Sequence, residues 1–287
     1  MIGGGDDRHI RRGVLLCLLS MLVFAAQDGI TKFLVKDFPV AQLLMIRYWV
    51  FFAFVAIYIA VRSGFREAAR SAYPMFQVVR ALLAVAEALL FGWGLRYLGL
   101  AESHALFAVF PLITLALARW TLGESVSIRQ WAATVLGMIG TLIILRPGAD
   151  VFNAIALVPL CAALVFAMYN ILSRKVGRAD TFATNVLYMA IVGVVATSCL
   201  GIPAWRSPSL VEWLWLSAYS VAGMAGHLLL IMALAYAPAT VLQPFNYTLL
   251  MFAAIVGLVV FGEIPGVYTL CGGGVILLAG LYSIRAR

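Results

Sequence analysis

Long apolar runs, each about the length of a helix that crosses a bilayer, follow one another along almost the whole sequence. The stretch 40–61, for example, carries a single charged residue, Arg47. A helix needs roughly 20 apolar residues to cross the hydrocarbon core, and the runs lack the alternation of membrane β-strands. The sequence therefore predicts an all-α, polytopic membrane protein with ten transmembrane helices, at about 13–35, 39–61, 73–98, 101–122, 128–145, 154–172, 182–202, 211–236, 240–261 and 266–284.

The composition excludes several other classes of protein. Hydrophobic residues make up 64% of the 287 residues and charged residues 11%, whereas a soluble domain is about half apolar and a quarter charged. A soluble globular protein, a disordered chain and a coiled coil are thereby excluded. Because the spans leave only short connections, we expect no nucleotide-binding domain, so that transport would be driven by gradients. The spans contain no HExxH, DDxxD or GxSG segment, which argues against an enzyme.

Lysine and arginine residues are distributed unequally between the two sets of connections. With a cytoplasmic N-terminus, thirteen of them lie on the cytoplasmic side and five on the other. The positive-inside rule then predicts that both termini are cytoplasmic in a multi-pass protein of the bacterial inner membrane. The net charge of +8 is explained by topology and by anionic membrane lipid, and we expect no nucleic-acid partner.

Short sequence matches recur at a nearly constant offset. The segment Leu-Val-Phe-Ala at 22–25 recurs at 164–167, and Gly-Glu at 123–124 recurs at 262–263. The matches predict two repeats of five helices each, at 1–148 and 149–287. Because five is an odd number, the second repeat enters the membrane inverted, and the two repeats are expected to enclose a central cavity.

Several of these features together are typical of one membrane family: Thr31-Lys32 at the end of the first span, Pro39 before the second, Arg47 within it, and Pro111 and Pro244, each followed by a Gly-Glu pair. On these residues the whole chain resembles the drug/metabolite transporter (DMT) superfamily, in its ten-span EamA-type branch. It is most similar there to bacterial aromatic amino acid exporters. The resemblance implies outward transport of amino acids and some cationic compounds by alternating access, and an architectural role for Arg47.

The third span carries the most prominent charged pair inside the membrane. Arg80 and Glu87 are seven residues apart, so both lie on one face of a helix, and Trp93 follows them. Polar groups at this depth are costly unless they face protein or water. We expect Arg80 to bind a substrate carboxylate and Glu87 an ammonium group or a proton. The alternative is an internal ion pair that ties this helix to its neighbours.

The first, fourth and eighth spans add further polar candidates. Asp28 and its neighbour Gln27 are predicted to contact substrate, although Asp28 could equally pair with Lys32 one turn later. His227 and His104 are candidates to line the pathway, because the pKa of histidine permits proton coupling. Packing within the bundle is the alternative for both histidines.

The ninth span gathers polar groups around a proline. Gln243, Asn246 and Tyr247 flank Pro244, and Pro111 lies midway along the fourth span. Each proline removes a backbone donor, which is tolerated only where the backbone faces protein or a wet cavity. We therefore predict that these polar residues bind substrate and that the two prolines act as gate hinges; a static bend is the alternative.

Aromatic residues at mid-depth are expected to form part of the cavity wall, through stacking and cation–π contact with the solute. Packing alone is the alternative for each of them. In the second half, Tyr169-Asn170 replaces the Gln27-Asp28 pair of the first. The aromatic and amide candidates of this group are Tyr48, Trp93, Tyr169, Asn170, Tyr188 and Tyr247.

No cofactor or metal site is expected, because the four cysteines and three histidines lack ligand spacing. Glu124 and Glu263 are read as structural acids at the start of the next helix. The function predicted is a secondary transporter, working as a monomer or weak dimer, that moves amino acids, including aromatic ones, outward. Alternatives are export of cationic drug-like compounds, another metabolite, and, as the weakest, an intramembrane enzyme.

Overall fold

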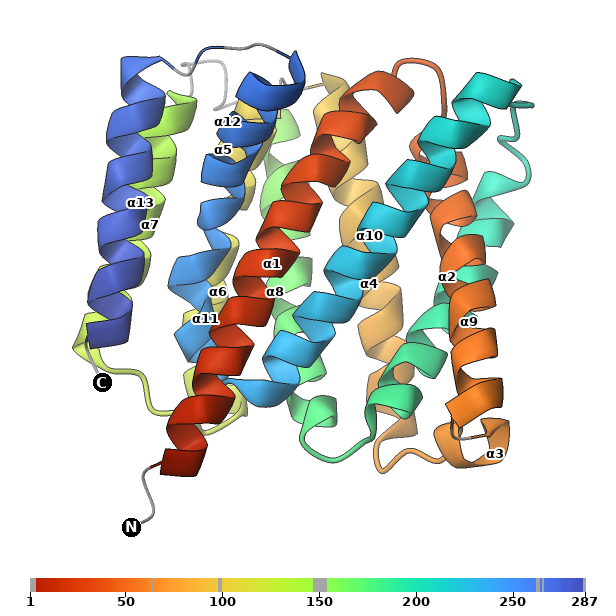
Figure 1. Ribbon diagram of the computed structural model, residues 1–287, viewed down its shortest axis with the longest axis horizontal. Helices are drawn as coiled ribbons and strands as arrows, with labels where there is room; N and C mark the ends of the chain where they lie inside the picture. The colour runs from red at the N-terminus through yellow and green to blue at the C-terminus, as the bar shows by residue number, and fades with distance from the viewer. Residues whose placement is uncertain are drawn as a thin grey trace.

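The computed structural model describes residues 4–62, 64–97, 100–146, 154–261, 264 and 266–285, and every regular element in this part of the chain is helical. Nine of the described helical segments are long and apolar enough to cross a membrane, and Val267–Tyr282 is a shorter apolar one. This confirms the predicted all-α, polytopic fold. The elements, drawn in Figure 1, are α1 (Gly4–Leu34), α2 (Val40–Arg62), α3 (Phe65–Ala68), α4 (Pro74–Tyr97), α5 (Leu100–Phe107), α6 (Phe110–Thr121), α7 (Ile128–Leu145), η2 (Ala154–Ala156), α8 (Leu157–Gly177), α9 (Phe182–Gly201), α10 (Leu210–Tyr236), α11 (Ala239–Asn246), α12 (Thr248–Phe261) and α13 (Val267–Arg285).

Two of the expected spans are broken helices. The fourth consists of α5 and α6, and Pro111 lies in the first turn of α6, where its missing N–H costs nothing. The ninth consists of α11 and α12, and Pro244 lies inside α11, which ends two residues later. The breaks face each other, because the Tyr247 hydroxyl donates a hydrogen bond of 3.1 Å to the Ala108 carbonyl. One break thus satisfies a carbonyl that the other leaves free.

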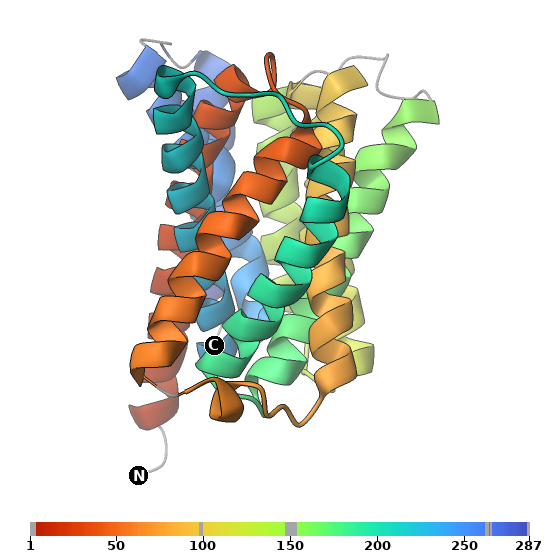
Figure 2. The same ribbon diagram turned by 90° about the vertical axis from the view of Figure 1, so that its right-hand side faces the viewer.

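The packing partners of the helices repeat between the two halves of the chain. The most extensive contacts are α1 with α10, α4 with α8, α2 with α9 and α7 with α13. If α8 is exchanged for α1, α9 for α2, α10 for α4 and α13 for α7, this set of contacts maps onto itself. Figure 2 shows the α2–α9 pair in front, in orange and blue-green. Figure 1 shows the start of α1 and the end of α13 at the same end of the bundle.

Small residues let α7 and α13 pack backbone against backbone. A Cβ atom built on Gly140 would lie 2.8 Å from the Gly272 carbonyl oxygen, which is closer than van der Waals contact. Close approach through small residues is the usual way in which helices associate in lipid. As Figure 1 shows, this pair stands at the edge of the bundle.

Candidate functional site

A cavity lies in the middle of the bundle, mainly between α1, α2, α4, α5 and α10. It measures about 1000 Å³, including the part that is continuous with solvent. Its lining reaches Val35 and Val40, where α1 connects to α2. That connection lies at the end of the bundle opposite to the chain termini (Figure 1). The cavity therefore extends toward the end away from the termini.

Five phenylalanine rings line this cavity, and four of them, all but Phe24, contact one another in an aromatic wall. They come from five helices: Phe24, Phe91, Phe107, Phe110 and Phe166. The ring centroids of Phe107 and Phe110 are 5.0 Å apart, those of Phe110 and Phe166 are 4.8 Å apart, and those of Phe91 and Phe107 are 4.9 Å apart. These spacings fall in the range of favourable aromatic pairs. The wall offers stacking surface for a flat, apolar part of a solute.

Ionisable groups of both signs complete the lining. Asp28 on α1 and Glu87 on α4 supply carboxylates, Arg47 on α2 supplies a guanidinium, and His104 and His227 supply imidazoles. His104 Nε2 lies 3.9 Å from Asp28 Oδ2. Charges at this depth are costly unless they face protein or water. The arrangement can therefore receive a solute that carries positive and negative groups beside an apolar surface.

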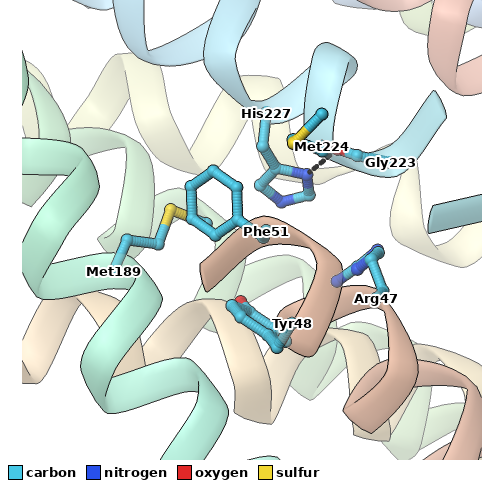
Figure 3. Close-up of a pocket in the computed structure, with 7 residues that line it drawn as sticks. All are labelled: Arg47, Tyr48, Phe51, Met189, Gly223, Met224 and His227. Carbon is cyan, nitrogen blue, oxygen red and sulfur yellow. Dashed lines mark hydrogen bonds between the residues drawn. The ribbon is translucent and has the colours of Figure 1, made fainter. Parts of the chain in front are cut away.

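A second, smaller space beside the cavity, which we call the deep lobe, lies between α2, α9 and α10. It measures about 210 Å³, including any part open to solvent, and is lined by Arg47, Tyr48, Phe51, Met189, Gly223, Met224 and His227. Arg47 and His227 also line the main cavity, so the two spaces adjoin. Figure 3 shows these two side chains converging on the deep lobe from α2 and α10.

Close packing of α1 on α10 positions the residues at this junction. A Cβ atom on Gly226 would lie 2.6 Å from Phe24 Cε1, and Ser20 Oγ donates a 2.8 Å hydrogen bond to the Gly226 carbonyl. The His227 ring stands edge-on to Phe24, with centroids 5.0 Å apart. A side chain at position 226 would collide with the Phe24 ring, so glycine is needed there. The Phe24 ring in turn contacts the His227 imidazole and orients it.

A buried ion pair between Glu124 and Arg174, extended by the more exposed Arg178, lies at the end of the bundle that carries the termini. Glu124 Oε1 accepts hydrogen bonds from Arg174 Nε at 3.1 Å and from Arg178 Nη2 at 2.6 Å. Glu124 Oε2 lies 3.3 Å from both the backbone nitrogen and the hydroxyl of Thr240. The expectation that Glu124 serves the helix that follows it was wrong, because α7 begins with a Ser127–Gln130 capping box. Glu124 instead caps α11, a helix of the other half.

A second polar network lies at the same end, between α4 and α9. Asp180 accepts hydrogen bonds from the Ser71 hydroxyl and from Gln77 Nε2 at 2.5 and 2.8 Å. Gln77 also donates to Asn185 Oδ1 at 2.6 Å. Arg80 Nη2 donates to Gln77 Oε1 at 2.8 Å and to the Asn185 carbonyl at 2.7 Å. These bonds join the two helices where the cavity has ended.

Comparison with known proteins identifies the chain. The model of the EamA-like transporter family matches residues 11–146 and again residues 153–285. The chain belongs to the EamA-like transporter family. It is accordingly a multi-pass membrane transporter rather than an enzyme, as predicted, and the two matches fall on the two halves of this transporter's sequence.

Curated relatives of this EamA-like transporter are similar over nearly their whole length. A riboflavin transporter of Vibrio cholerae is 29% identical over 94% of this chain and 92% of its own. An S-adenosylmethionine uptake transporter of Rickettsia bellii is 28% identical over 96% and 94%. A pseudopaline exporter of Pseudomonas aeruginosa is 23% identical over 97% and 98%. A solved structure with 15% identity superposes with a TM-score of 0.81 over 98% of this chain and 97% of its own, which shows the fold.

The structure brings about half of the predicted site residues to the cavity. Glu87 and Asp28, with Gln27, His227 and Asn246, line it. Tyr48 lines the deep lobe. The side chain of Lys32, the alternative partner of Asp28, and that of Glu263 lie outside the described residues.

The remaining predicted residues do not line either space. Trp93 is 51% exposed on the outer surface, and the half-buried Tyr188 donates to the Ala69 carbonyl at the closed end. Arg80 is fully buried in the network described above. The other residues of this group are buried in the bundle: Pro111, Tyr169, Asn170, Gln243, Pro244 and Tyr247.

The aromatic wall is the part of the site that the sequence-based prediction missed. It singled out tyrosines and tryptophans, whereas phenylalanines form the wall. One signal for it existed in the repeat, because Phe24 and Phe166 occupy matching places in the two Leu-Val-Phe-Ala segments, and both rings line the cavity. Nothing in the local sequence distinguishes the other three rings from packing residues.

Proposed function

We propose that this transporter carries small amphipathic solutes that combine a flat aromatic part with an amino group, aromatic amino acids being the first class to test. One observation carries the proposal: the phenylalanine wall shares its cavity with the carboxylates of Asp28 and Glu87. Apolar and aromatic lining with a few convergent polar groups is the usual composition of a small-molecule site.

The residues divide the recognition between them. Stacking on Phe110 and Phe166 would hold the aromatic part, and each aromatic pair contributes about 0.5–1.5 kcal/mol beyond simple burial. Glu87 and Asp28 would pair with the amino group. The amides of Gln27 and Asn246 would add hydrogen bonds that orient the solute. The names of two relatives agree with this chemistry, since riboflavin and S-adenosylmethionine both carry fused heteroaromatic rings and the latter an amino acid group.

Transport would follow from alternation between two packings of the halves 1–148 and 149–287, the inverted repeats. The breaks beside Pro111 and Pro244 are the proposed hinges. Both termini are proposed to be cytoplasmic in the inner membrane, so that the cavity opens to the periplasm in this state. Net movement of solute is proposed to be outward, driven by its gradient and carried out by a monomer or weak dimer.

A second candidate is the export of cationic drug-like compounds without a carboxylate. It is favoured by the two carboxylates that line the cavity beside the single guanidinium of Arg47. Cations also bind favourably over aromatic faces.

The experiment is a flux assay with purified protein in liposomes, in both directions, with and without a pH gradient. We expect labelled phenylalanine or S-adenosylmethionine to move faster than into protein-free liposomes. If only a permanent cation such as tetraphenylphosphonium moves, the second candidate replaces the first. If none of these solutes and not riboflavin moves, the proposal is wrong.

Substitutions locate the site within the same assay. Glu87→Gln should lower the flux of an amino-bearing solute about tenfold, the effect of losing one charged hydrogen bond. Phe166→Leu should lower it several-fold. Trp93→Leu and Phe54→Leu are matched controls on the outer surface, where Phe54 is 42% exposed, and should leave flux unchanged. Equal effects of the cavity and control variants would contradict the assigned cavity.

A further inference from the structure

Arg47 is a charged side chain inside the membrane that lacks a partner of opposite charge. It is 6% exposed, and within the described part of the chain no carboxylate lies within 4.0 Å of its guanidinium. Its five N–H donors make no hydrogen bond within 3.5 Å to another described residue. Arg174, which is also buried, by contrast bonds to Glu124 at 3.1 Å.

Two tyrosine rings lie beside the guanidinium of Arg47. The Arg47 Cζ atom lies 5.4 Å from the Tyr48 ring centroid and 6.0 Å from that of Tyr219. Cation–π contact stabilises the charge through the flat face of the group. Such contact does not occupy the N–H donors at the edge of the group, which can bind a carboxylate bidentately.

A glycine on α10 positions the stem of this arginine. A Cβ atom on Gly223 would lie 2.5 Å from Arg47 Cδ and 2.6 Å from Gln27 Oε1. Three helices thus meet at Gly223, and any side chain there would displace both groups. Gln27 Oε1 and the Tyr48 hydroxyl are themselves buried without a hydrogen-bond partner among the described residues. The contact with Gly223 therefore fixes the position of the Arg47 side chain, while no carboxylate of the described residues forms an ion pair with it.

Arg47 supplies the positive charge of the deep lobe, and none of the other described residues that line it is acidic. His227 Nδ1 lies 3.1 Å from the Gly223 carbonyl and donates to it, so Nε2 of the neutral ring is an acceptor and does not itself attract an anion. The Tyr48 hydroxyl is a further donor that can face an anion. Asp28 and Glu87 line the main cavity, but neither of them lines the deep lobe.

We propose that Arg47 binds the carboxylate of the transported solute at the junction of the deep lobe and the main cavity. The solute's amino group then faces Asp28 and Glu87, and its ring lies along the phenylalanine wall. This inference rests on the proposed function and adds to it the requirement for a carboxylate. It replaces the architectural role that resemblance implies for Arg47 with a role in specificity.

The test compares phenylalanine with phenylalaninamide, which has nearly the same shape but lacks the negative charge. Both are used in proteoliposome flux assays on the full chain, and the ratio of their rates is measured. A ratio is independent of the fraction of protein that is folded. Wild type should favour phenylalanine by at least about tenfold, the effect of a lost charge-assisted bond. Equal rates in the wild type overturn the inference but leave the proposed function intact.

Variants assign the preference to Arg47. Arg47→Gln should abolish the ratio by slowing phenylalanine alone, and Arg47→Lys should restore it in part because a point charge cannot bind bidentately. Gly223→Ala should lower the ratio by displacing the arginine stem. Its control is Gly273→Ala, where the nearest atom to a new Cβ is 3.8 Å away. If Arg47→Gln and Gly223→Ala keep the wild-type ratio, Arg47 does not bind the carboxylate. If neither compound moves in any variant, the proposed substrate class itself fails.

Discussion

The Tyr247 hydroxyl donates a hydrogen bond of 3.1 Å to the carbonyl of Ala108, and so joins the breaks in two helices from opposite halves of the chain. Both residues are buried. A carbonyl freed by a helix break inside the membrane has no water to bind and needs such a donor. The two interruptions are therefore one structural unit, which is consistent with the hinge role proposed for them.

Removing this hydroxyl should destabilise the protein measurably. Tyr247→Phe leaves the Ala108 carbonyl without its donor, and a buried unsatisfied group costs about 1–3 kcal/mol. Tyr188→Phe is the matched control, because its hydroxyl donates at the same distance of 3.1 Å to the Ala69 carbonyl near the aqueous end, where water can replace it. Denaturant unfolding in detergent measures both. Equal losses of stability in the two variants would contradict the distinction.

The Tyr247 ring also makes Gly137 on α7 irreplaceable. A Cβ atom there would overlap Tyr247 Cδ2, and overpacking of this kind typically costs about 1–3 kcal/mol. Gly137→Ala should therefore lower the free energy of unfolding by that amount. Gly273→Ala on α13, with nothing nearer than 3.8 Å, should leave it almost unchanged. The comparison needs only thermal denaturation of the two purified variants, and a stable Gly137→Ala protein would show that the ring moves freely.

Glu124 should be the most sensitive acid at the closed end. Its side chain is 7% exposed and that of Arg174 is 10% exposed, so Glu124→Gln leaves a buried cation without its counter-charge. We expect a loss of about 2–4 kcal/mol, somewhat less than for a fully broken buried pair because the amide oxygen still accepts. Glu67→Gln, an exposed acid in α3, should change stability little. A similar melting temperature for both variants would refute the assignment.

Cysteine labelling should locate the cavity mouth. In a background without the native cysteines, Val40→Cys should react with a membrane-impermeant maleimide added to intact cells, because Val40 lines the cavity at the end away from the termini. Arg66→Cys is exposed on α3 at the other end and should react only after permeabilisation. Saturating solute should protect Val40→Cys. The reverse pattern of labelling would invert the proposed orientation.

Hydropathy predicted the number and approximate position of the spans, but it could not reveal the breaks. The fourth and ninth runs are continuous in hydropathy, yet the chain interrupts them near Ala108 and at Tyr247. A proline signals a local loss of one donor. Whether the helix bends or breaks depends on a partner for the freed carbonyl, here supplied from the other half of the chain.

In the third span, residue spacing correctly placed Arg80 and Glu87 on one helix but did not predict which of them lines the cavity. Arg80 and Glu87 do lie on one helix, but α9 packs around Arg80 through Asn185, whereas the cavity reaches Glu87. Trp93 is six residues beyond Glu87, about 240° around the helix, and therefore faces outward. A helix face can be packed at one depth and open at another, which one-dimensional periodicity cannot show.

By itself the sequence determined that this chain is a helical membrane protein, because long apolar runs partition into the bilayer whatever their tertiary contacts. Its repeats and family motifs further indicated a transporter, and the family matches at 11–146 and 153–285 fall on the two halves of the sequence. Only the tertiary structure decided which of the polar groups within the spans line the same cavity. Asp28, Arg47 and Glu87 come from three helices, and the approach of α10 at Gly223 aims the guanidinium. Such convergence depends on how helices cross, and no single segment of sequence encodes it.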